Sequence, residues 1–302
     1  ILVAFCAYAP NAEAQDGLKL PKLVLPAITN YAPSNSAETS APANMRELTL
    51  AAKLTEDGDL LKEGLTWRIF KPDPTDDGKL PLIATATGGA SRFALEPGSY
   101  LVHAAFGRAG ITKRISLTAD NREEILVLDA GGLKLDAVLS GGVRIPASKL
   151  RFSIYSGEDQ ANGERALILP DVKPDDIVRL NTGTYHIVSN YGAENATIRA
   201  DLKVEAGKLT EATVEHKAAE LTMKLVREAG GEAIADTAWS VINPSGEVIK
   251  ESVGAFASMV LAEGDYTVIA KNKDKLFQRD FKVEAGKNQD VEVLVTDQAI
   301  SP

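Results

Sequence analysis

The chain has 302 residues, of which 44% are hydrophobic and 25% charged, and its 24 glycines and 14 prolines are close to average usage. This composition excludes collagen, a wholly disordered chain and a coiled coil, and no apolar run approaches the roughly 20 residues of a membrane-spanning helix. The formal charge of −9 repels polyanions. Nucleic acid is therefore not an expected partner, and no transmembrane segment is expected in the mature chain.

The first residues indicate export. Residues 1–9 are uncharged and mostly apolar, and Ala12-Glu13-Ala14 places small residues where a signal peptidase reads. We therefore interpret residues 1–14 as the remnant of a signal peptide. The alternatives are a buried first strand, or a lipid anchor at Cys6, for which Phe5 is not the small preceding residue that lipidation needs.

Cys6 is the only cysteine, so cleavage leaves a mature chain with neither disulfides nor sulfur ligands for zinc. Residues 15–44 carry four prolines among Ala, Ser, Asn and Thr, and proline interrupts both helices and sheet pairing. This segment predicts an extended tether. Residues 298–302 form a short tail.

From Leu48 onward, short alternating runs are separated by turn residues at the spacing typical of an all-β sandwich. The pattern repeats three times, which fixes the architecture. Each copy has an opening strand, a second strand headed by an aromatic residue, and the motif Leu-x-x-Gly-x-Tyr. The opening strands begin at Leu48, Leu133 and Leu221, the aromatic residues are Trp67, Phe152 and Trp239, and the motifs run over 95–100, 180–185 and 261–266.

The repeat predicts three tandem antiparallel β-sandwiches over residues 45–130, 131–218 and 219–297. Each copy ends with two alternating runs that we interpret as a terminal hairpin. In the last two copies the turn between these runs reads Val-Glu-Ala-Gly-Lys, where glycine supplies the positive φ of a tight reversal.

We expect the residues that recur in all three copies to stabilise the fold. Gly98, Gly183 and Gly264 stand at a sharp corner that favours a residue without a Cβ. The tyrosine two places later can bury its ring while its hydroxyl reaches a nearby backbone group, as in a tyrosine corner. The three repeated aromatic residues are expected in the cores, with platforms for stacking sugars as the alternative.

The Leu-x-Pro-Gly-x-Tyr element of the first copy, with alternating strands on both sides, resembles the transthyretin-like or carboxypeptidase-regulatory-like, immunoglobulin-like β-sandwich repeats of bacterial exported proteins. The proline stands only at Pro97, and Thr182 and Glu263 replace it in the later copies. The resemblance implies a spacer, adhesion or binding module that carries no catalytic residues.

The residues that could carry chemistry are few and scattered. His103, His186 and His216 share no metal-ligand spacing. The sequence also lacks a Gly-x-Ser-x-Gly elbow and a phosphate-binding loop that leads into a helix. We therefore predict no enzyme activity and assign no catalytic, cofactor-binding or metal-binding residues.

Two acidic turns, 56–59 and 73–78, could supply oxygen ligands for calcium, and the polar loop 157–164 is similar. Solvated turns are the simpler interpretation, so no cofactor is expected and calcium is kept as an alternative. Asn195-Ala196-Thr197 matches a glycosylation acceptor, which matters only in a eukaryotic source.

The sequence therefore predicts an exported, non-enzymatic binding, adhesion or structural module of the bacterial cell envelope, in the periplasm or at the cell surface. A protein partner is expected, and edge strands and interdomain loops are the expected contact surfaces. One alternative is a carbohydrate-binding accessory protein. Another is a subunit of a larger envelope complex docked through residues 15–44, in which the apolar residues of 18–28 would be buried against another chain.

Overall fold

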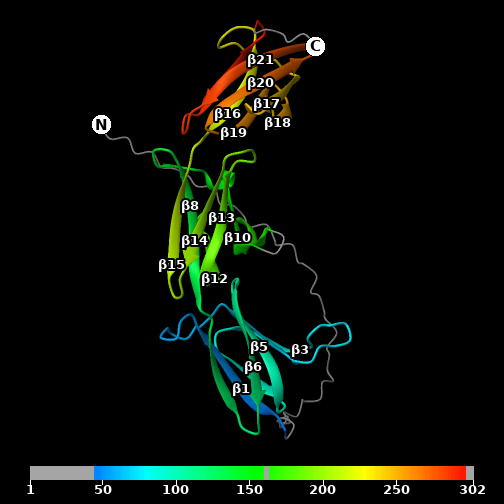
Figure 1. Cartoon of the computed structure of the whole chain (residues 1–302), viewed down its shortest axis with the longest axis vertical. Coiled ribbons are helices and arrows are strands. Elements are labelled where there is room, and N and C mark those ends of the chain that lie inside the picture. The colour runs from blue at the N-terminus through cyan, green and yellow to red at the C-terminus, as the bar shows by residue number, and fades with distance from the viewer. Residues whose placement is uncertain (1–43, 160–162, 297–302) are drawn as a thin grey trace, which may run out of the picture. The chain divides into compact units, whose positions relative to one another are not determined.

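A computed structural model describes residues 44–159 and 163–296 (Figure 1). The interpretations of residues 1–14, of the tether before Asn44 and of the tail 298–302 concern residues outside this range. The described residues belong to one compact unit that begins at Asn44. Among them the only helical element is a single 3-10 turn, Ala147–Lys149, and no helix has the length and apolar character needed to cross a membrane.

The first sandwich contains two sheets, with the strand orders β3-β2-β5-β6 and β4-β1-β7. Their alternating burial follows the alternation of apolar and polar residues in the sequence. The strands are β1 (Arg46–Lys53), β2 (Leu65–Phe70), β3 (Leu82–Gly88), β4 (Ser91–Leu95), β5 (Gly98–Phe106), β6 (Ala109–Leu117) and β7 (Arg122–Val127).

The second sandwich repeats this plan, with the orders β11-β10-β13-β14 and β12-β8-β15 and with β9 paired to β8. Its strands are β8 (Ala130–Leu139), β9 (Val143–Arg144), β10 (Leu150–Asp159), β11 (Arg165–Val172), β12 (Ile177–Asn181), β13 (Gly183–Tyr191), β14 (Thr197–Val204) and β15 (Leu209–His216).

The third sandwich has the orders β18-β17-β20-β21 and β19-β16-β22. Its strands are β16 (Ala218–Val226), β17 (Thr237–Ile242), β18 (Val248–Val253), β19 (Phe256–Ala262), β20 (Gly264–Asn272), β21 (Lys275–Val283) and β22 (Gln289–Leu294). The prediction of three tandem β-sandwiches is therefore confirmed.

The last strand of each sandwich differs from the prediction. The two final runs do not form a hairpin, because they belong to opposite sheets. Instead β7, β15 and β22 each cross over and pair in parallel with the opening strand of their own sandwich, β1, β8 and β16. A final hairpin would leave one side of the opening strand without a partner, whereas the crossover adds a strand there. All other pairs between the strands are antiparallel.

The repeated aromatic residues lie in the cores, as predicted. Trp67 and Phe152 are fully buried and Trp239 is 2% exposed, and each belongs to the hydrophobic cluster of its sandwich. The Trp67 Nε1–H donates to the carbonyl of Gly89 at 2.8 Å, and the Trp239 Nε1–H donates to that of Gly254 at 2.9 Å. These bonds satisfy the polar N–H of each buried indole, which would otherwise cost free energy.

The tyrosine corners are also confirmed. The hydroxyls of Tyr100, Tyr185 and Tyr266 each donate to the backbone carbonyl four residues earlier, at 2.8, 2.8 and 3.0 Å. The steric role predicted for the glycines holds at two of the three corners, because Gly183 and Gly264 have φ of +159° and +157°, which side chains with a Cβ rarely adopt. It is wrong for Gly98, which does not have positive φ and where a Cβ would lie at an ordinary 3.7 Å from the ring of Tyr100. The tyrosine hydrogen bond is the feature that all three corners share.

We expect Tyr100→Phe to lower the free energy of unfolding of the first sandwich by about 1–2 kcal/mol, because the carbonyl of Glu96 loses its donor. Urea unfolding followed by Trp67 fluorescence in a Trp239→Phe background measures this. Gly98→Ala is the matched control and should change the stability by less than about 0.5 kcal/mol. A larger loss in the control would show that Gly98 has a steric role at the first corner as well.

Candidate interaction surface

The three histidines do not meet in one site. His103 Nδ1 lies 2.9 Å from the Thr112 hydroxyl, His186 Nδ1 lies 2.7 Å from an Asp201 oxygen, and His216 Nε2 lies 2.8 Å from the Ser189 hydroxyl. The Ser189–His216 pair is buried. Over the described ranges, no group of three or more His, Cys, Asp or Glu side chains could hold a metal ion.

The acidic turn between β2 and β3 uses its carboxylate internally. Asp77 accepts a hydrogen bond from the Thr75 hydroxyl, and the Lys79 ammonium lies 3.2 Å from its other oxygen. The Thr75 hydrogen bond and then Lys79 lower the pKa of the Asp77 carboxyl. The loop 157–164, named above as similar, lies partly outside the described residues.

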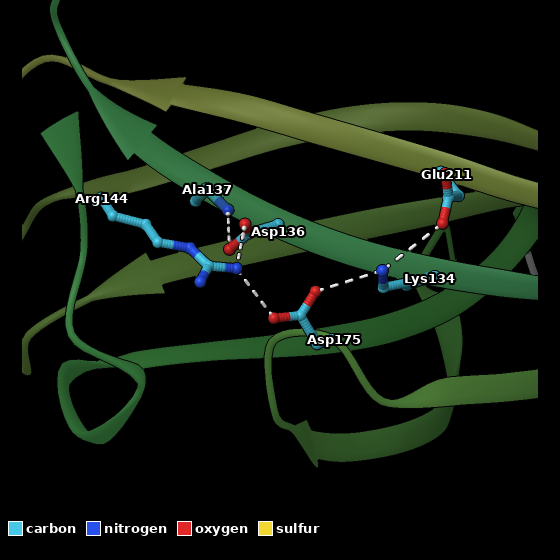
Figure 2. A network of polar contacts seen from close by, with 6 residues as sticks. All are labelled: Lys134, Asp136, Ala137, Arg144, Asp175 and Glu211. Atoms are coloured by element: carbon cyan, nitrogen blue, oxygen red, sulfur yellow. Dashed lines mark hydrogen bonds and ion pairs between the residues drawn. The ribbon is translucent and has the colours of Figure 1, made fainter. Parts of the chain in front are cut away.

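A network of charged side chains covers the outer face of the sheet that contains β8. Figure 2 shows Asp175 between two cations, Lys134 at 3.3 Å and Arg144 at 3.0 Å, with Glu211 and Asp136 at the two ends of the chain of contacts. Its cations and anions alternate, and Arg144 is 71% exposed. Exposed pairs of this kind contribute about 0–1 kcal/mol each, so the network is a solvated surface with no unpaired group that would bind a ligand.

The junction between the first two sandwiches is built on the second tyrosine corner. Asn181, whose carbonyl accepts the Tyr185 hydroxyl, has Oδ1 3.1 Å from the amide N–H of Gly110 in β6. Its Nδ2 donates to the carbonyl of Leu128, in the chain that leads to β8, at 2.8 Å. One side chain thus links the corner of the second sandwich to the end of the first.

The junction between the second and third sandwiches is built on the third corner. Asn195 Oδ1 accepts the N–H of Ala262 at 3.0 Å, and its Nδ2 donates to the Tyr266 hydroxyl at 2.8 Å. The neighbouring Glu194 accepts the N–H of Val260 at 3.2 Å. The oxygen and the nitrogen of the Asn195 side-chain amide are therefore both hydrogen-bonded within the fold. This disfavours Asn195 as a glycosylation acceptor.

Close backbone approach at this junction requires a glycine. Gly192 has φ +76°, and a Cβ there would lie only 2.7 Å from the Cβ of Val260. Although it is in β19, Val260 packs with the core of the second sandwich. A side chain at position 192 would therefore push apart the two surfaces that Asn195 joins.

The residue before the corner glycine explains why proline occurs in one copy alone. The N–H of Thr182 donates to the carbonyl of Asp129, and the N–H of Glu263 donates to the carbonyl of Lys217, both at 2.8 Å. These two carbonyls belong to the short linkers before β8 and β16. Pro97 has no N–H to donate, so the first corner does not bind the preceding chain in this way.

Among the strands at the sheet edges, β3 and β19 alone have no charged residue. The strands that occupy the place of β3 in the other sandwiches are protected. β11 contains Arg165, Pro170 and Asp171, and β18 contains Lys250 and Glu251. All three strands have a register shift in their pairing, so charge and proline are what distinguish β3 from the other two. Charges, prolines and bulges are the features that keep edge strands from pairing with other chains.

The two uncharged edges differ in what covers them. The N–H groups of Val260 and Ala262 in β19 are bonded by side chains of the second sandwich, as described above. β3 pairs with β2 alone among the described strands. Leu82 and Ile83 are 54% and 43% exposed, and Thr85 and Thr87 are also exposed. The edge of β3 is thus the candidate interaction surface.

A family model described as the Rhizobiales growth-associated tandem repeat domain matches residues 220–295, which span most of the third sandwich. No curated protein matches the chain.

Among solved structures, the chain is similar to the Bacillus anthracis TIE protein (17% identity over 85% of this chain and 51% of that chain, TM-score 0.24), so it spans about half of that protein. It is also similar to the minor pilin GBS52 of Streptococcus agalactiae (14% identity over 57% of this chain and 95% of that chain, TM-score 0.31). A third similar structure is a streptococcal ancillary pilin (11% identity over 83% of this chain and 98% of that chain, TM-score 0.30). At these TM-scores the similarities indicate nothing about function.

We expect Asn195→Ala to lower the free energy of unfolding of the third sandwich by about 1–3 kcal/mol, because the Ala262 N–H and the Tyr266 hydroxyl each lose a partner. Urea unfolding followed by Trp239 fluorescence in a Trp67→Phe background measures the change. Ser245→Ala, in an exposed turn of the same sandwich, is the control. Equal stability of the two variants would show that Asn195 does not hold the junction.

Stability should fall as the pH is lowered from 7.5 to 5.5. Burial lowers the pKa of His216, and burial together with Arg68 lowers that of His103, both from an ordinary value of 6.5. Below about pH 6.5 the unfolded chain therefore takes up protons that the folded chain does not, so the stability present at higher pH is lost. Calorimetric Tm values measure this, and His216→Gln should reduce the difference between the two pH values. An unchanged Tm would contradict the assignment.

Proposed function

We propose that this protein is an exported, non-enzymatic module of the bacterial cell envelope, in the periplasm or at the cell surface, that acts through protein–protein contacts made by an exposed sheet edge. The three predicted repeats, 45–130, 131–218 and 219–297, are its domains, and hydrogen-bonded junctions hold their ends together. One observation carries the proposal, which is that the edge strand β3 has neither charge nor proline and is not paired on its outer side by any described strand.

The rest of the described surface supports a binding role over a catalytic one. The histidines are held apart by separate partners, and the charges of the network around Asp175 pair with one another. The match of residues 220–295 to a growth-associated tandem repeat domain supports a growth-associated role. The carbohydrate-binding alternative needs exposed aromatic platforms, and both tryptophans lie in the cores.

The test is fractionation of the source bacterium, followed by pull-down with the tagged full chain. We expect the protein in the envelope or periplasmic fraction and a protein partner that co-purifies at a fixed ratio, with or without chelator. Thr87→Lys, on β3, should reduce this recovery, whereas Val253→Lys, at the equivalent edge β18, should not. Retention in the cytoplasm, or recovery that is the same for both variants, would contradict the proposal.

A further inference from the structure

We infer that the partner of β3 is β3 of a second copy of this chain, paired antiparallel about a two-fold axis so that two four-stranded sheets become one. The inference rests on the proposed function, since it names the occupant of the same edge. Two-fold pairing uses the same surface on both copies, so the strand must be complementary to itself.

The charge pattern makes β3 self-complementary. In an antiparallel two-fold pair, the same short stretch of sequence lies on both sides of the new contact, so a charged strand would be brought against its own charges. From Leu82 to Gly88 no residue is charged. This is notable on a chain of formal charge −9, because the edge can meet its copy without opposing like charges.

The exposed side chains also suit strand pairing. Ile83, Thr85 and Thr87 stand on the outer face of the sheet, and all three are β-branched, the type favoured in strands. On the other face Ala84 and Ala86 pack against the core of the first sandwich, which holds the strand in place. Leu82, half exposed at the start of the strand, would be covered by the partner.

The same chain already uses its other uncharged edge strand for docking. Glu194 and Asn195 of the second sandwich bind the N–H groups of Val260 and Ala262 in β19. These two residues are separated by one position, as are the N–H groups on one edge of a strand. The uncharged edge of β19 is thus a contact surface for the second sandwich. We infer that the uncharged edge of β3 is likewise a contact surface, and its partner lies outside the described residues of one chain.

The size of the contact predicts its strength. A single pair of seven-residue strands buries less than the roughly 1,600 Å² of a standard protein–protein interface. We therefore expect a weak, concentration-dependent dimer with a Kd on the order of 10–100 µM. Such a contact would form mainly where the protein is concentrated in the envelope.

Sedimentation of the purified full chain between about 1 and 300 µM tests the inference. The wild type should pass from monomer to dimer. Thr87→Lys should weaken the dimer at least tenfold, and more so at low salt, because the two lysines repel. Thr87 is chosen because Thr85 donates a hydrogen bond to the carbonyl of Trp67, which a variant at that position would lose. Val253→Lys, on the exposed edge of β18, is the matched control and should dimerise like the wild type.

Hydrogen exchange gives a second readout that does not depend on a variant. The amides of residues 82–88 should exchange more slowly at high concentration than at low concentration, while those of β18 should not change. A monomer at every concentration, equal weakening by both lysine variants, or exchange in β3 that is independent of concentration would overturn the inference. If another envelope protein is still captured through β3, the proposed function stands and only the second copy is excluded.

Discussion

The tyrosine corner is the interaction on which the rest of this structure depends. In each sandwich a tyrosine hydroxyl holds the carbonyl four residues back, just before the strand that crosses to the other sheet. The second and third corners also carry the junctions. Asn181 belongs to the second corner and bonds backbone groups of Gly110 and Leu128, and Asn195 bonds the Ala262 N–H and the Tyr266 hydroxyl of the third corner. One local hydrogen bond therefore shapes both the sandwich and its attachment to its neighbour.

This arrangement explains how a chain without disulfides in its described part can join three sandwiches through very short linkers. Each linker carbonyl, at Asp129 and Lys217, is bound by the residue before the next corner glycine. Backbone hydrogen bonds of this kind need correct geometry but no particular side chain, so Thr182 and Glu263 serve equally. The first corner has Pro97 there, and it is free of this attachment.

Much of the fold could be read from the sequence, because the repeat places the same residue types at the same structural positions. The core role of Trp67 and the hydrogen bond of Tyr100 follow from local pattern. The pairing of the last strand of each sandwich does not follow from local pattern. The alternation of apolar and polar residues shows that β7 is a strand, but it does not show which strand β7 pairs with. The roles of Asn181 and Asn195 were missed because the groups that they bind lie in other parts of the chain, which the local sequence does not show.

The uncharged edge was visible in the sequence as the run from Leu82 to Gly88, but its meaning required the sheet order. Only the structure shows that β3 ends a sheet and that β19, equally uncharged, is already bound by its neighbour. The most direct test of the account is a photo-cross-linking amino acid placed at position 87 in the living bacterium. We expect a cross-linked product twice the mass of the chain, absent with the same probe at position 253. Cross-linking that is equal at both positions, or absent from position 87, would contradict it.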